Sequence, residues 1–402
     1  MRAIMRTTIA ATLTAFLLAG GAHAQASSQA PAACGGDLAT FLEGVKAEAI
    51  ARGVPPEVAD RALAGARIDE KVLSRDRAQG VFRQTFLEFS QRTVSQSRLD
   101  IGRRKLKELS SVFARAEQDY GVPGPIIAAF WAMETDFGVV QGDFNTRNAL
   151  VTLAHDCRRP ELFRPQLLAA IEMVGHGDLD PAGTTGAWAG EIGQVQMLPR
   201  DIIAFGVDGD GDGHVNVKQS APDAILTAAK FIQNLGFRPG QPWIQEVTLP
   251  ESLPWERSGL QSGMTAADWF AAGVVPRDGE TAFGQLEASL VLPQGRKGPA
   301  FLTYPNFDIY LAWNQSFIYT TSAAYFATRL AGAPPYARTT PEEGLSDESM
   351  KQLQTRLQAL GHDVGKIDGI LGSGTRTAIQ KEQLRLGMPA DGWATRALLD
   401  AL

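Results

Sequence analysis

The chain of 402 residues has few of the side chains on which several enzyme chemistries depend. It has five His and two Cys, no His-Glu-x-x-His motif and no cysteine pair at zinc spacing, which argues against a zinc hydrolase. No Gly-x-Ser-x-Gly turn is present, which argues against a serine hydrolase of the α/β type. Carboxylate chemistry is what remains for an enzyme.

Long runs of one kind are also missing. The net charge is -6 and no long basic run occurs, so nucleic acid is not an expected partner. The apolar run Thr8–Ala19 is too short to span a bilayer. It follows Arg2 and Arg6 and precedes Ala22-His23-Ala24, so we predict a secretory signal over residues 1–24, cleaved near Ala24. The alternative is an uncleaved anchor.

Cys34 and Cys157 form an even pair in a chain predicted to be exported, which indicates one disulfide. Two buried free thiols are the alternative. Cys34 follows Pro31-Ala32-Ala33 and lies well beyond the apolar run, so it is not expected to carry a lipid.

Most of the chain up to Leu235 has apolar residues at helical spacing, and short β-type runs follow at Ile244–Leu249 and Leu286–Leu292. Helical spacing returns from Asn306 to Ala331. We therefore predict a mainly α fold with a small β-containing subdomain.

The stretch Pro123–Gly138 organises this pattern. It predicts one short helix with Pro125 in its first turn and Gly138 just past its end. No charge occurs between Ile126 and Met133, and then Glu134 follows on the same face as Trp131. Burial disfavours the ionised carboxylate, which suits a general acid near neutral pH. A helix-end Glu that reaches solvent or pairs with Arg is the structural alternative.

A glycine-rich segment and an acidic loop come next. The segment Gly186–Pro199 has no Lys-Ser/Thr after its glycines and no strand before it, so it is not a phosphate loop. Its Gln194 and Gln196 either donate hydrogen bonds to a substrate or form hydrogen bonds within the core. The sequence favours neither interpretation. The loop that follows has oxygen ligands at calcium-loop spacing, but Gln219 stands where a bidentate Glu belongs. The candidate calcium ligands are Asp208, Asp210, Asp212, His214 through its carbonyl, and Asp223. An acidic turn without metal is the alternative.

A Pro- and Thr-rich stretch marks the clearest domain boundary. We place a linker at 333–344 and a separate small helical domain at 345–402, which has a weak internal half-repeat and no catalytic cluster. A small module behind a linker usually binds something and raises local concentration.

These motifs together resemble the membrane-bound lytic transglycosylase B family of peptidoglycan-cleaving enzymes. The segments that carry the resemblance are YGVPGPIIAAFWAMETDFG, AWAGEIGQVQMLP, VDGDGDG and NFDIYLAWNQS, with Arg158-Arg159 and Phe163-Arg164. The last part of the chain resembles a helical peptidoglycan-binding domain through LQTRLQALG, DGILGSGTRTAI and DGWATRALL.

The resemblance implies a lysozyme-like α+β catalytic domain over 37–332 and a three-helix C-terminal domain. Residues 25–36 are small and polar, which predicts a flexible leader. Glu134 matches the family's single acid/base, which cleaves the bond between N-acetylmuramic acid and N-acetylglucosamine and leaves a 1,6-anhydro end. Gln196 and Asn314 match residues of the saccharide groove, and Trp313 and Gln194 are taken as further contacts. Arg158 and Arg159 match a pair near the peptide-bearing sugar.

The expected location is the periplasm, as a monomer that needs no cofactor for its chemistry and has one structural Ca2+ site. The chain departs from the family pattern at Ala187, where many relatives have Ser, at Trp313, where Tyr is common, and at Glu191-Ile192, where Ala-Met is usual. The extra carboxylate leaves two alternatives: a muramidase that uses Glu191 as base, and a wall-binding scaffold without catalysis.

Overall fold

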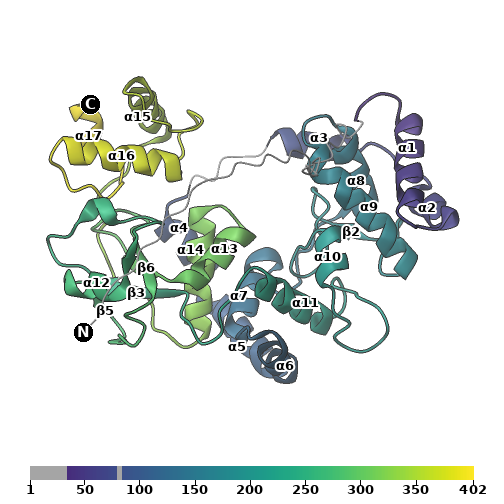
Figure 1. The fold of residues 1–402 in the computed structure, drawn as a ribbon, viewed down its shortest axis with the longest axis horizontal. Helices are drawn as coiled ribbons and strands as arrows, with labels where there is room; N and C mark the ends of the chain where they lie inside the picture. The colour runs from purple at the N-terminus through teal and green to yellow at the C-terminus, as the bar shows by residue number, and fades with distance from the viewer. Residues whose placement is uncertain (1–33, 79–83) are drawn as a thin grey trace, which may run out of the picture. The chain divides into compact units, whose positions relative to one another are not determined.

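The computed structural model describes residues 34–78 and 84–402 (Figure 1). The predicted signal at 1–24 lies outside these residues, as does most of the leader. Helix α7 (Gly124–Thr135) lies inside the region formed by residues 34–330. Every residue from Ile126 to Ala132 is at most 2% exposed, so the predicted buried helix is confirmed.

The helices that precede α7 are α1 (Leu38–Ala51), α2 (Pro56–Leu63), α3 (Glu70–Arg77), α4 (Phe86–Thr93), α5 (Gln96–Glu108) and α6 (Ser110–Tyr120). Those that follow are α8 (Thr146–His155), α9 (Pro160–His176), α10 (Pro199–Phe205) and α11 (Ala221–Asn234). Side chains that accept hydrogen bonds from the first-turn N–H groups start several of them, including Asp37, Thr85, Ser95 and Asn145.

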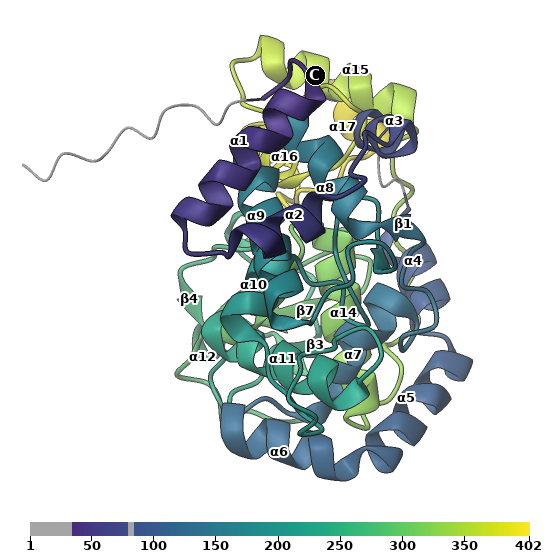
Figure 2. The ribbon, with the colours of Figure 1, turned by 90° about the vertical axis from the view of Figure 1, so that its right-hand side faces the viewer.

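Helices α1 and α2 lie over α9 (Figure 2). The disulfide between Cys34 and Cys157 joins the chain just before α1 to the turn between α8 and α9. It closes a loop with a sequence separation of 123 residues. Loop-closure entropy gives such a cross-link about 4–5 kcal/mol of stabilisation.

The β-containing part is a five-stranded antiparallel sheet in the order β4-β6-β7-β3-β5. A second, two-stranded sheet pairs β1 with β2 and ties the start of α8 to the glycine-rich segment. The strands are β1 (Phe144–Asn145), β2 (Thr185–Gly186), β3 (Ile244–Thr248), β4 (Met264–Thr265), β5 (Val275–Pro276), β6 (Glu287–Val291) and β7 (Phe301–Thr303).

Short helices flank the sheet, and α14 returns the chain to α7. The elements are η1 (Trp255–Arg257), α12 (Ala266–Ala271), η2 (Pro305–Phe307), α13 (Asp308–Trp313) and α14 (Phe317–Leu330). Helix α7 packs against α14, α5, α6 and α11 (Figure 1). None of the helices in the part of the chain that the structure describes is both long and apolar enough to cross a membrane.

The C-terminal domain consists of α15 (Asp347–Ala359), α16 (Ser373–Arg385) and α17 (Arg396–Ala401). It has its own apolar core, which includes Leu353, Ile379 and Leu398. The segment predicted as a linker packs against α4, where the Tyr336 hydroxyl lies 3.0 Å from the hydroxyl of Ser90.

Candidate active site

Glu134 is the next-to-last residue of α7, and its side chain stays partly exposed. The indole Nε1 of Trp313 donates a hydrogen bond of 2.9 Å to its Oε1, and the Tyr319 hydroxyl donates to the same oxygen. Within residues 34–78 and 84–402, Oε2 has no hydrogen-bond partner. One carboxyl oxygen is therefore held as an acceptor, and the other is free to carry a transferable proton.

A break between α13 and α14 brings these two donors together. The sequence predicts one helix from Asn306 to Ala331, and this prediction is wrong because Asn314 is extended, with φ −147°. Its Oδ1 accepts from Ser316 N at 2.9 Å, and the Ser316 side chain caps the new helix. In an unbroken helix Trp313 and Tyr319 would point about 120° apart around the axis, so the break lets both reach Glu134.

The surroundings of Glu134 favour its protonated form. Burial raises the pKa of its carboxyl, the hydrogen bonds from Tyr319 and Trp313 act in the opposite direction, and the charge of Glu191 raises it further. The net result is a raised pKa, which a general acid needs near neutral pH.

The C-terminal end of α7 is held by groups outside the helix. The helix ends at Thr135, earlier than the predicted stop at Gly138, and Asp136 and Phe137 both adopt left-handed backbone with φ of 53° and 60°. Such conformations cost about 1–3 kcal/mol each. The Thr135 hydroxyl donates to the Gln194 carbonyl and accepts from Gly138 N at 2.8 Å, which offsets part of this cost.

Arg98, from α5, holds the same helix end. Its guanidinium donates to the Asp136 carboxylate at 3.0 Å, to the Thr93 carbonyl at 2.7 Å and to the Ala132 carbonyl. It also lies 5.7 Å from the ring centroid of Phe326 in α14. Arg98 therefore connects the two helices that supply Glu134 and Tyr319.

Glu191 lies on the glycine-rich segment and acts electrostatically on Glu134. Its carbonyl accepts from Ala187 N at 2.9 Å, which closes the segment into a tight turn. Burial raises the pKa of its carboxyl, and its Oε2 is buried with no hydrogen-bond partner among the described residues. Ala187 has a methyl side chain and offers no side-chain donor.

The two glutamines of this segment differ. Gln194 is buried, and its backbone N and O bond to Val217 and Thr135. Gln196 has φ 51°, and its amide donates to the carbonyls of Gln141 at 3.2 Å and Gly193 at 2.8 Å. The amide of Gln196 is thus satisfied by backbone in this structure.

Arg158 and Arg159 both donate to the carboxylate of Asp76, which is almost fully buried. Burial alone would raise the pKa of Asp76, but the hydrogen bonds from Arg158 and Arg159 hold it below its usual value. The predicted substrate-binding pair is therefore also an anchor between α3 and the turn before α9.

The acidic loop fits a hard cation in part. Single carboxylate oxygens of Asp208, Asp210 and Asp212 lie within 4.8 Å of one another, and oxygen ligands are those that calcium prefers. Asp223 lies outside this cluster, because its two oxygens accept from Gly209 N at 2.9 Å and from Asn216 N. It holds the loop backbone instead.

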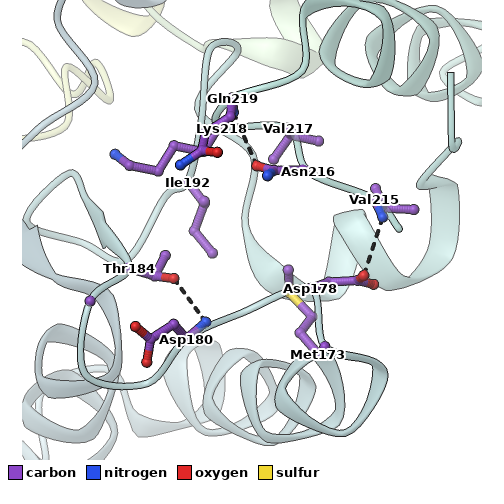
Figure 3. Close-up of a pocket in the computed structure, with 12 residues that line it drawn as sticks. Met173, Asp178, Asp180, Thr184, Ile192, Val215, Asn216, Val217, Lys218 and Gln219 are labelled. Carbon is purple, nitrogen blue, oxygen red and sulfur yellow. Dashed lines mark hydrogen bonds between the residues drawn. The ribbon is translucent and has the colours of Figure 1, made fainter. Parts of the chain in front are cut away.

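The imidazole of His214 contacts a carboxylate outside that cluster, with Nδ1 3.2 Å from Asp178 Oδ1. A cavity of about 310 Å³ lies beside this loop (Figure 3). Met173, Ile192 and Val217 contribute apolar walls, and Asp178 and Asp180 contribute carboxylates. Glu134 does not line this cavity, so we assign the cavity no part in the chemistry.

Two known protein families match this chain. The pattern of the transglycosylase SLT domain matches residues 37–328, and that of a putative peptidoglycan binding domain matches residues 346–402. The chain belongs to the transglycosylase SLT family. The resemblance inferred from the motifs is confirmed at this level.

The structure of SltB3 from Pseudomonas aeruginosa in complex with NAG-anhNAM-pentapeptide is similar to this transglycosylase over 91% of this chain and 99% of that one, with 33% identity and a TM-score of 0.83. Membrane-bound lytic murein transglycosylase B of Escherichia coli is 30% identical over 204 residues, which are 50% of this chain and 55% of that protein. The chain thus spans about half the length of this curated relative.

A structure of the Escherichia coli lytic transglycosylase Slt35 in complex with calcium shares the fold, with 24% identity, a TM-score of 0.62, and coverage of 74% of this chain and 95% of that one.

Sequence reasoning missed three site residues of this transglycosylase. Tyr319 falls within the run of helical spacing from Asn306 to Ala331, and its hydroxyl in an apolar helix is the signal that could have found it, because a buried Tyr hydroxyl usually has a partner. Asp76 and Arg98 gave no signal, because the contacts that place them here are distant in the chain. Asp76 bonds to residues 82 and 83 positions away, and Arg98 reaches the end of α7 over 34 and 38 positions.

Proposed function

We propose that this chain is a lytic transglycosylase that cleaves the β-1,4 bond between N-acetylmuramic acid and N-acetylglucosamine in peptidoglycan. The observation that carries the proposal is the Glu134 carboxyl, with one oxygen bound by two neutral donors and the other free. The similarity to SltB3, whose structure contains a NAG-anhNAM-pentapeptide, supports the substrate class.

In the first step protonated Glu134 gives its proton to the glycosidic oxygen, and the bond from that oxygen to the muramyl C1 breaks. The acetamido group of the same sugar stabilises the positive charge at C1. In the second step the Glu134 carboxylate takes the proton of the muramyl 6-hydroxyl while O6 bonds to C1. The product has a 1,6-anhydro ring, and no water is consumed.

Trp313 and Tyr319 serve both steps. Hydrogen bonds to an ionised group are stronger than those to a neutral one, so the two donors stabilise the carboxylate that forms after proton transfer. Burial works in the opposite direction and keeps the acid protonated before transfer. Asn314, Gln196, Gln194, Arg158 and Arg159 remain candidate substrate contacts.

The unpartnered oxygen of Glu191 supports a second candidate function, hydrolysis of the same bond. A carboxylate that activates water near the acid is the arrangement of a glycoside hydrolase. It predicts reducing muramic ends.

The deciding experiment is mass spectrometry of the fragments released from purified sacculi by wild type and by Glu134→Gln. We expect anhydro-muropeptides from wild type and a loss of about 10²–10⁴-fold in the variant, the range for general acid–base catalysis. Products with one added water would favour hydrolysis through Glu191. Binding to sacculi without any release would favour a wall-binding scaffold.

We also propose that Asp208, Asp210 and Asp212 hold a structural calcium ion, with the His214 carbonyl as a further ligand. The convergence of three carboxylates without a cationic partner among the described residues supports this site.

Calcium at 100 times its Kd should stabilise the fold by about 2.7 kcal/mol. Thermal unfolding with calcium and with a chelator measures this, and Asp210→Asn should reduce the difference. An unchanged midpoint on calcium addition would leave an acidic turn without metal.

The predicted signal and the family favour action in the periplasm. The domain at 346–402 belongs to the peptidoglycan-binding family and would hold the enzyme on the wall.

A further inference from the structure

The C-terminal domain docks on the catalytic region through polar and apolar contacts. Helix α16 and the turn before Trp393 face the loop that follows β6 and the residue that follows η1. The Gln380 amide donates to the Ser258 carbonyl at 2.9 Å, and the Asp391 carboxylate accepts from Arg296 N at 2.9 Å. Ala390 joins the apolar core of the sheet subdomain. This interface is formed within one chain and has apolar as well as polar parts.

Arg376 places a positive charge within this interface. Its Nη2 donates to the Pro293 carbonyl at 2.8 Å and its Nη1 to the Leu292 carbonyl at 3.3 Å. Its Nε is buried and has no partner among the described residues. Burial lowers the pKa of Arg376 to about 10. A buried guanidinium loses its hydration, which costs free energy unless its surroundings compensate. The groups that contact Arg376 therefore depend on its side chain for their arrangement.

Two aromatic rings lie against the Arg376 guanidinium. The Trp393 centroid, from the C-terminal domain, is 5.8 Å away, and the Phe317 centroid, from α14, is 5.2 Å away. Both distances are within the range of a cation–π interaction. The Arg376 side chain thus joins the C-terminal domain to the first residue of α14.

The same turn of α14 carries an active-site donor. Phe317 and Tyr319 are two residues apart, and Tyr319 N is capped by the Ser316 hydroxyl at 3.4 Å. The Tyr319 hydroxyl donates to Glu134. This turn begins directly after the break at Asn314, so it has no preceding helical turn to hold it in place.

We infer that Arg376 is a positioning residue for catalysis, because it holds Phe317 and the first turn of α14 so that the Tyr319 hydroxyl reaches Glu134. The C-terminal domain then does more than bind the wall, since it completes the support of the active site. This inference rests on the proposed lytic activity.

The test measures kcat and KM of the full-length chain on a soluble glycan of two disaccharide-peptide repeats, with anhydro products separated by chromatography. Arg376→Ala should lower kcat by about tenfold, because small misplacements of catalytic groups cost one to two orders of magnitude. KM should stay within about twofold. The matched control is Gln380→Ala, one turn further along α16, which weakens the docking without a contact to α14 and should keep kcat within about twofold.

A second variant, Phe317→Leu, removes the ring while the C-terminal domain stays intact, so it tests the same contact if Arg376→Ala does not fold. Its kcat should also fall, and the double variant should be no slower than the slower single variant, since both changes break one contact. Losses that multiply, or an unchanged kcat in Arg376→Ala with weaker binding to sacculi, would overturn the inference. Failure of wild type to release anhydro products would instead overturn the proposed function.

Discussion

Two carboxyl groups of this chain, Asp76 and Glu134, have opposite surroundings. Asp76 accepts from the guanidinium groups of Arg158 and Arg159, and its pKa is held low. Glu134 accepts from an indole and a phenol, which bring no positive charge, and its pKa is raised. Both sites satisfy a carboxyl with two donors, so hydrogen bonding alone does not distinguish them.

The charge of the donors makes the difference. Two cations keep Asp76 ionised across the working pH range, which suits an anchor and excludes proton transfer. Neutral donors leave desolvation as the main effect on Glu134, which keeps a proton available. Glu134 can therefore be distinguished as the proton donor because no Arg or Lys side chain bonds to its carboxyl among the described residues.

The largest change in unfolding free energy should come from Asp76→Asn. It leaves two arginines without their carboxylate, and we expect a loss of about 3 kcal/mol of unfolding free energy, at the low end for breaking a buried pair because both arginines are partly exposed. Because the pKa of Asp76 is lowered in the fold, its stabilisation is present above the usual Asp pKa and is lost as the pH falls. Denaturant unfolding at several pH values should show the difference from wild type shrinking in acid.

Glu134→Gln gives the opposite pH dependence in the same assay. The raised pKa of Glu134 means that the folded state binds its proton more tightly, so wild type loses stability as the pH rises. The variant should gain stability relative to wild type as the pH rises above the usual pKa of a glutamate. Parallel curves for the two variants would contradict the comparison.

A smaller effect is expected from Tyr319→Phe. It removes one hydrogen bond to a group that becomes charged, worth about 1.5–3 kcal/mol, so kcat should fall by roughly tenfold or more. The lost bond also lets the pKa of Glu134 rise further, so the alkaline limb of the kcat/KM profile should move to higher pH. Tyr325→Phe is the matched control, since that hydroxyl lies on the same helix and bonds to Arg329 and not to Glu134. Equal effects in both variants would contradict the assigned role.

The smallest effect is expected from Glu191→Gln. The charge of Glu191 raises the pKa of Glu134, so the neutral amide should move the alkaline limb of kcat/KM to lower pH. The rate at the optimum should stay within about tenfold, since no proton transfer in the proposed steps uses Glu191. A shift to higher pH, or loss of all products, would assign Glu191 a direct part in the reaction.

The local pattern of the chain predicted much of this fold. The uncharged run before Glu134 and the runs that became β3 and β6 all stand in the structure. The errors are the end of α7 and the break after Trp313. Both depend on partners distant in the chain, Gln194 and Arg98 at the first and Glu134 at the second, which local propensity does not contain.

By itself the sequence determined that a carboxyl sits at the end of a buried helix, that an acidic loop follows a glycine-rich segment and that a small domain closes the chain. These follow from residue type and spacing, which act locally. Only the tertiary structure decided that Glu134 receives neutral donors, that Arg158 and Arg159 are held by Asp76, and that Arg376 reaches the helix of Tyr319. Those outcomes depend on which side chains share a desolvated space, and desolvation is a property of the packed fold.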